Sequence, residues 1–162
     1  MRPGAAFFLG LPAWAYPGWA GKYFPAGGSA LEHYAQVFNT VEGNTTFYRV
    51  PDASTVARWR EAVAGAHFRF SFKLPRTVTH NRHPDREDMA RFFSVLATLE
   101  DKLGPFLVQC PASVGPAELP ALGRLLERLP QGYRYALELR HPAFFSRPER
   151  VEPLLEHTGA GR

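Results

Sequence analysis

The sequence has a single cysteine, Cys110, among its 162 residues. One cysteine cannot form a disulfide within the chain, and this usage is typical of a reducing compartment, so we expect a cytoplasmic protein. The sequence also lacks an apolar run of the roughly 18 residues that a membrane helix needs. A secretory signal is disfavoured, because the apolar stretch that begins at Ala5 is broken at Gly10 and Pro12. We therefore expect no membrane partner.

Glycine and proline are too few for a low-complexity chain, since 14 Gly and 15 Pro lie well below the roughly 25–30% that marks one. The chain is 45% hydrophobic and 21% charged, which is enough apolar material for a packed core. Domains commonly span roughly 100–200 residues. The composition and length therefore predict one folded domain over residues 1–162.

Five short apolar or alternating runs, each bounded by glycine, proline or asparagine, predict β-strands. They are Ala5–Gly10, Phe38–Glu42, Phe68–Lys73, Phe106–Cys110 and Tyr135–Leu139. A helical pattern follows each strand, and the strands recur about every 30 residues, which is the size of a βαβ unit. The expected helices begin at Ser29, Asp52, Asp85, Pro116 and Pro148, and the third should run until Gly104-Pro105. The fold class is therefore α/β with a mainly parallel sheet.

Two architectures accommodate five such units. The length favours a five-stranded doubly wound sheet, because a complete (β/α)₈ barrel usually has about 250 residues. The strand pattern favours a partial TIM-like barrel: in Phe68–Lys73 the phenylalanines share one face and Arg69, Ser71 and Lys73 share the other. Doubly wound sheets are covered on both faces and read as continuous apolar runs. We predict the partial barrel, with the doubly wound sheet as the alternative.

Polar side chains gather at the carboxyl ends of the predicted strands, where both architectures bind ligands. These residues are Glu42, Asn44, Lys73, Gln109, Glu138, Arg140 and His141. In a curled sheet Glu42, Lys73 and Glu138 would point into one space, where a lysine between two carboxylates stays charged and suits acid–base chemistry. The alternative is a buried salt-bridge layer that only fills the barrel.

The excess of positive charge lies in one stretch, residues 67–83, which has four Lys or Arg and no Asp or Glu. His80 lies in this stretch, and such a segment beside aromatic residues suits a phosphate or carboxylate ligand. Trp14, in an aromatic loop, and Tyr48, in a polar run after the second strand, are candidates for stacking on a ring. No tightly spaced metal-ligand motif occurs, so we predict no metal site. Cys110 is interpreted as a small buried apolar residue.

These segments resemble the YecE-like family, a domain family of unknown function with a barrel fold. The matching segments, in the order of the family, are Trp14–Trp19, Tyr23–Pro25, Thr40–Pro51, Phe70–Lys73, Thr79-His80, Leu103–Pro105, Gln109–Pro111 and Glu138–Pro142. The resemblance implies a TIM-like barrel, similar to that of the endonuclease IV superfamily, and a nucleic-acid or phosphate ligand. It does not identify a reaction, and the cofactor stays unknown.

The chain departs from this family at two places. Gly10–Trp14 stands where the family usually has a Gly-Thr-Ser-Gly-Trp turn, so a small hydroxyl on the ligand side is replaced. The chain also stops at Arg162, where a sixth strand should begin, so we expect a domain that lacks the last three strands. Two interpretations stay open: the chain is a truncated product, or its open edges pair with another chain in an oligomer.

The sequence therefore predicts a pocket at the strand ends for an anionic small molecule or a nucleic acid. In this hypothesis Glu42, Lys73 and Glu138 are the candidate catalytic residues. The candidate ligand-binding residues are Trp14, Asn44, Tyr48, His80, Gln109, Arg140 and His141. A glycosidase-like enzyme that uses Glu42 and Glu138 as its carboxylate pair is one alternative. A non-catalytic binding protein is the other, and the sequence alone does not decide whether the protein is an enzyme.

Overall fold

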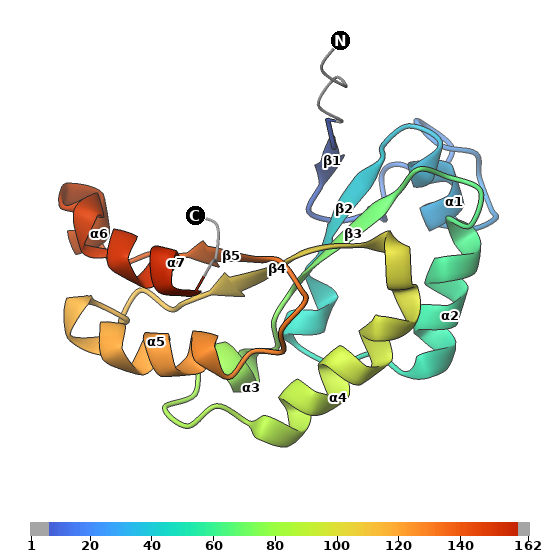
Figure 1. Cartoon of the computed structure of the whole chain (residues 1–162). Coiled ribbons are helices and arrows are strands. Elements are labelled where there is room, and N and C mark those ends of the chain that lie inside the picture. The colour runs from blue at the N-terminus through green and yellow to red at the C-terminus, as the bar shows by residue number, and fades with distance from the viewer. Residues whose placement is uncertain (1–6, 159–162) are drawn as a thin grey trace, which may run out of the picture.

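The computed structural model describes residues 7–158 and shows an all-parallel sheet with helices packed along one side (Figure 1). The strands are β1 (Gly10–Leu11), β2 (Thr40–Gly43), β3 (Arg69–Lys73), β4 (Leu103–Gln109) and β5 (Tyr135–Glu138). The α-helices are α1 (Ala30–Ala35), α2 (Ala53–Ala62), α3 (Arg76–Thr79), α4 (Arg86–Leu96), α5 (Leu119–Glu127), α6 (Ala143–Ser146) and α7 (Glu152–Thr158). Short 3-10 helices cover Thr45–Phe47, Ala97–Lys102, Pro116–Glu118 and Pro148–Arg150. No helix in the described part is both long and apolar enough to cross a membrane.

The strands lie side by side in chain order, β1-β2-β3-β4-β5, and every neighbouring pair is parallel. A doubly wound sheet reverses its strand order at a switch point, whereas a TIM-like barrel adds each strand to the same edge. The described sheet has no reversal. The prediction of a partial TIM-like barrel is therefore confirmed, and the alternative of a doubly wound sheet is wrong.

Three helices begin where side-chain caps predict them. The Ser29 hydroxyl accepts a hydrogen bond from the backbone N–H of Glu32 at 3.3 Å. Asp52 caps α2 in the same way, and the carboxylate of Asp85 accepts from two backbone N–H groups at the start of α4. Each cap satisfies donors that the first turn of a helix leaves unpaired, typically contributing about 1 kcal/mol.

The two faces of β3 differ sharply in polarity. Phe70 and Phe72 are fully buried, and the ring of Trp59 from α2 stacks on Phe72 with 5.7 Å between ring centroids. Gly43 of β2 is needed for this packing, because a Cβ atom there would lie 2.5 Å from the Phe72 ring. Lys73 lies on the opposite face and is half-buried. The apolar core thus fills the space between sheet and helices, and the polar face is directed to the barrel interior.

The first predicted strand is misplaced. Ala5 and Ala6 lie outside the described residues, and Phe7–Leu9 form no strand, so pairing begins only at Gly10. The cause is the side chain of Asn39, which accepts from the Leu9 N–H at 2.7 Å and donates to the Phe7 carbonyl at 2.8 Å. A side chain thus takes the place of the backbone ladder.

The end of the third predicted helix is also wrong. α4 stops at Leu96, a 3-10 segment follows, and Glu100 adopts φ 51°, which no right-handed helix contains. Gly104 and Pro105 are not the helix end but part of β4. The pairing of β4 with β3 is irregular between Phe70 and Phe72, next to the point where the Ser71 hydroxyl donates to the Pro105 carbonyl. A proline is tolerated in this inner strand at such an irregularity.

Candidate anion-binding pocket

A pocket of about 450 Å³ lies at the carboxyl ends of the strands. Its lining contains polar and aromatic side chains from four segments: Asn44, Phe47, Tyr48, Lys73, Arg76, His80, Gln109 and Arg140. Lys73 and Gln109 are the last residues of β3 and β4, and Arg140 follows the end of β5. The structure thus brings together six of the ten site residues predicted from the sequence.

Three cations, Lys73, Arg76 and Arg140, line the pocket, and we refer to them as the cation cluster. The lining includes no carboxylate. Glu138 is adjacent, and its Oε1 atom lies 3.2 Å from the Nε atom of Arg140. Among the described residues, no carboxylate oxygen lies within 4 Å of the Lys73 ammonium or the Arg76 guanidinium. The pocket therefore carries positive charge that the protein itself only partly compensates.

The floor of the pocket is held by Gln109 and Glu138, which lie opposite each other on β4 and β5. The Gln109 amide is 8% exposed, and its Nε2 atom donates to the Glu138 carboxylate, with 2.9 Å to each oxygen. The same carboxylate contacts Arg140. Glu138 thus orients two residues of the pocket, and both of its oxygens already have partners.

His80 is held in one orientation by its neighbour. The Nδ1 atom lies 2.8 Å from the Thr79 hydroxyl, which itself donates to the Pro75 carbonyl. This contact fixes the orientation of the imidazole ring, and the ring edge with Nε2 has no hydrogen-bond partner among the described residues. Burial lowers the pKa of His80 below its usual range, and Arg76, Arg140 and Lys73 lower it further. His80 is therefore neutral at pH 7.

Two aromatic residues after β2 form the remaining wall. The Phe47 ring contacts His80 edge-on at 4.9 Å, and the Lys73 ammonium lies 5.6 Å from its centroid. Tyr48 packs edge-on against Phe47 and is 81% exposed. The buried Thr46 hydroxyl lies 2.7 Å from the Lys73 carbonyl and ties this turn to the end of β3. The turn therefore presents one open aromatic face beside the cation cluster.

Asn44 follows β2 and lines the same pocket. Its Nδ2 atom donates to the Pro12 carbonyl at 3.1 Å, which fixes the direction of the amide. The Oδ1 atom is buried and has no hydrogen-bond partner among the described residues. A buried acceptor without a partner lowers the stability of the folded chain. Such unpaired polar atoms are a common feature of binding sites.

The other predicted site residues lie elsewhere. Glu42 is opposite Ser71 in the sheet, two positions below the level of Lys73, and does not line the pocket. The predicted arrangement of Lys73 between two carboxylates is not assembled, because neither Glu42 nor Glu138 forms an ion pair with Lys73 in the described part.

Trp14 and His141 both serve local packing. Trp14 contacts Trp59 and Phe70 edge-on, so it covers the apolar core on the helix side of the sheet. The His141 Nδ1 atom accepts from the Ala143 N–H at 3.1 Å, at the start of α6.

Sequence reasoning missed two members of the pocket, Arg76 and Phe47, as site residues. Arg76 lies in the basic stretch of residues 67–83, and Phe47 adjoins Tyr48 in the polar run, so both carried a signal. What the sequence did not show was α3, a four-residue helix that brings Arg76 beside Lys73.

Two other kinds of chemistry bear on the described part of the chain, a reactive cysteine and a metal site. Burial and the charge of Glu138 raise the pKa of the Cys110 thiol to about 12, so this buried residue stays protonated at pH 7. Within residues 7–158, no three His, Cys, Asp or Glu side chains are placed to hold a metal ion.

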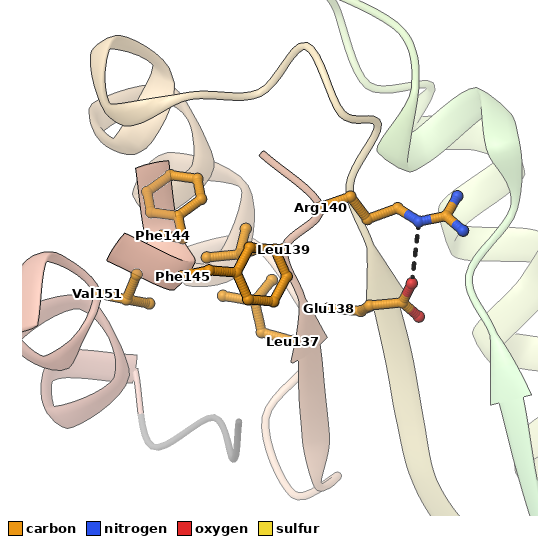
Figure 2. Close-up of a pocket in the computed structure, with 7 residues that line it drawn as sticks. All are labelled: Leu137, Glu138, Leu139, Arg140, Phe144, Phe145 and Val151. Atoms are coloured by element: carbon orange, nitrogen blue, oxygen red, sulfur yellow. Dashed lines mark ion pairs between the residues drawn. The ribbon is translucent and has the colours of Figure 1, made fainter. Parts of the chain in front are cut away.

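A second pocket, of about 440 Å³, lies at β5 beside α6 (Figure 2). Its lining combines a charged pair, Glu138 and Arg140, with five apolar side chains: Leu137, Leu139, Phe144, Phe145 and Val151. Figure 2 shows the Glu138–Arg140 ion pair directed away from these apolar side chains. Arg140 thus lines both pockets, whereas Lys73 and Arg76 line the first.

Comparisons with known proteins agree with the fold. Residues 8–162 match the family described as "Protein of unknown function DUF72". The "UPF0759 protein YecE" of Escherichia coli strain K12 is 41% identical over 150 residues, which are 91% of this chain and 53% of that protein, and the O157:H7 protein matches equally. The chain therefore spans about half the length of the curated relatives that it matches.

Two solved structures of DUF72 family proteins are similar to this chain. TM1631 from Thermotoga maritima MSB8 superposes with a TM-score of 0.74 at 27% identity, covering 94% of this chain and 62% of that one. EF0366 from Enterococcus faecalis V583 gives 0.63 at 26% identity, covering 92% and 57%. These proteins share the fold, and their descriptions state no activity.

Proposed function

Since the chain belongs to the DUF72 family of proteins of unknown function, we propose that its pocket at the strand ends binds a phosphorylated ligand. The observation that carries this proposal is the cation cluster of Lys73, Arg76 and Arg140, which meets in one pocket without a lining carboxylate. Like charges brought together repel one another, and an anion bound between them removes that repulsion.

The types of cation suit phosphate. Arginine presents a planar fork of donors that matches two phosphate oxygens, and lysine adds a compact charge with three donors. The Glu138 carboxylate already orients Arg140. Lys73 is the last residue of β3, and its backbone carbonyl accepts a hydrogen bond from the Thr46 hydroxyl. Donors that are fixed before binding lose less conformational entropy when the ligand arrives.

The pocket also has room and an apolar surface for the rest of a ligand. Its volume of about 450 Å³ lies within the range of small-molecule sites, roughly 300–1,000 Å³. The exposed Tyr48 ring is next to it and offers a flat face on which a base or a sugar ring can stack. A phosphorylated small molecule or the end of a nucleic acid strand meets both requirements.

The function that this supports is binding, and no reaction is assigned to it. The glycosidase alternative requires two free carboxylates on either side of a ligand. Glu42 is not in the pocket lining, and the Glu138 carboxylate is occupied by Gln109 and Arg140. No observation favours that alternative.

The proposal is tested by isothermal titration calorimetry with inorganic phosphate at a low and a high salt concentration. We expect one saturable site that weakens as salt rises, because ionic contacts are screened. Arg76→Gln should weaken binding roughly 10-fold or more, since a hydrogen bond to a charged group contributes about 1.5–3 kcal/mol. Arg124→Gln is the matched control, because Arg124 is an exposed residue of α5 outside the pocket and loses the same charge.

Two results would contradict the proposal. Absence of binding at low salt would mean that the cation cluster holds no phosphate. An equal loss of affinity in Arg76→Gln and Arg124→Gln would mean that phosphate responds only to the overall charge of the chain, and the cluster would then be a structural feature.

A further inference from the structure

We propose that the pocket selects a terminal phosphate, a phosphate monoester carried by a ring-containing group, over the internal phosphodiester of a continuous strand. This inference rests on the proposed function and narrows the class of ligand. Two sources share this chemistry: a free nucleotide or sugar phosphate, and the phosphorylated end of an oligonucleotide. Charge balance, the arrangement of the cations and the exposure of the lining residues each point to it.

The charge balance favours a dianion. The three cations of the cluster and the single carboxylate of Glu138 leave a net charge of +2 around the pocket, because His80 is neutral. A phosphate monoester has a second pKa of about 6 and carries close to two negative charges at pH 7. An internal phosphodiester carries one. The monoester therefore neutralises the pocket, whereas the diester leaves one positive charge uncompensated.

The arrangement of the cations favours a phosphate with three free oxygens. Lys73 comes from the end of β3, Arg76 from α3 and Arg140 from the segment after β5, so each approaches from a different element. A terminal phosphate has one ester bond and three oxygens to share among three donors. A diester has two ester bonds and only two such oxygens, so the three cations would have to share them.

The exposure of the lining residues favours a ligand whose ring lies beside Tyr48. The floor is formed by Gln109, which is buried and fixed by Glu138. Arg76, Arg140 and Tyr48 are exposed and form the rim. A terminal phosphate can enter such a pocket while its ring remains at the rim beside Tyr48.

The experiment is fluorescence anisotropy with one single-stranded oligonucleotide, labelled at its 3′ end and prepared with and without a 5′-phosphate. We expect the phosphorylated form to bind about tenfold more tightly or better, because it adds one charge-assisted contact. Adenosine 5′-monophosphate should displace it at about tenfold lower concentration than adenosine 3′,5′-cyclic monophosphate, which is a diester. Displacement by the free monophosphate with no preference between the oligonucleotides would assign the site to small molecules.

One substitution tests whether the preference for the phosphorylated oligonucleotide arises in this pocket. Arg140→Gln lowers the net charge of the pocket by one, so the advantage of the phosphorylated oligonucleotide should fall to about threefold or less, whereas Arg124→Gln should keep it. If the preference is unchanged in Arg140→Gln, the assignment to this pocket is wrong.

The outcomes separate this inference from the function on which it rests. Equal affinity for both oligonucleotides and for both adenosine phosphates, with binding still dependent on Arg76, overturns the selection of a terminal phosphate and leaves phosphate binding intact. Absence of binding by every probe and by inorganic phosphate overturns both.

Discussion

Replacing Lys73 by methionine removes one positive charge from the pocket while keeping most of the side chain. Lys73 is half-buried, and its ammonium lies 5.6 Å from the centroid of the Phe47 ring. Methionine retains the unbranched stem, and its sulfur packs well beside an aromatic ring. No carboxylate among the described residues depends on Lys73 for an ion pair. The variant should therefore fold with a stability within about 1 kcal/mol of the parent chain.

The effect on binding should be much larger than the effect on stability. Loss of a hydrogen bond from a charged donor costs about 1.5–3 kcal/mol, which corresponds to a roughly 10- to 150-fold weaker affinity for inorganic phosphate. Calorimetric titration measures that affinity directly, and urea unfolding measures the stability in parallel.

Lys22→Met is the matched control for this variant. Lys22 also lies over an aromatic ring, with 5.1 Å between its ammonium and the centroid of Tyr23, but it is exposed and outside the pocket. Its replacement should change the affinity less than about twofold at moderate salt, because charges beyond a screening length of about 10 Å contribute little. Equal effects of the two substitutions would refute the reasoning, since they would show that phosphate senses total charge and not the pocket.

Four further predictions follow from buried and partly buried groups. Binding of sulfate, which stays dianionic near neutral pH, should raise the lowered pKa of His80, so the protein should take up protons as the anion binds. Calorimetry in buffers of different ionisation enthalpy should detect this uptake, and His80→Gln should abolish it. Without an anion, the pKa of His80 is lower in the folded chain than in the unfolded chain, so the unfolded chain binds more protons. The free energy of unfolding should therefore fall as the pH drops through about 6.5. Urea unfolding should show a smaller fall in the His80→Gln variant. Cys110, with its pKa near 12, should react with a thiol reagent at pH 8 only at the rate of unfolding, and rapid reaction in the native state would contradict its burial. Tyr34→Phe should lower the free energy of unfolding in urea by about 1–3 kcal/mol, because the buried hydroxyl accepts a hydrogen bond from the backbone of β1 and donates one to the backbone of β2. Tyr133→Phe is the control and should change the stability far less, since the Tyr133 hydroxyl bonds no described residue.

The architecture was predictable because its signals are local. Alternation in Phe68–Lys73 separates the buried face of β3 from its polar face, and Ser29, Asp52 and Asp85 mark helix starts with capping side chains. The misplaced first strand depends instead on a contact between residues that are distant in the sequence. Asn39 satisfies backbone groups near Leu9 through its side chain, and no propensity rule anticipates such a bond between residues 30 positions apart.

The members of the site were only partly predictable, because their placement depends on strand register. Glu42 and Lys73 both face the barrel interior, yet the sheet pairs Glu42 with Ser71 and leaves Lys73 two positions further along. His141 follows a strand end as expected, but its ring bonds the first turn of α6. Arg76 enters the pocket from a helix too short to show a periodic pattern.

The most direct test of the central claim is a titration with inorganic phosphate followed by nuclear magnetic resonance of the side-chain Nε–H groups of arginine and of the histidine rings. The account predicts that the signals of Arg76, Arg140 and His80 shift together and saturate with one dissociation constant, while the signal of Arg124 stays in place. Shifts that do not saturate, or that are as large at Arg124 as at Arg76 and Arg140, would contradict it.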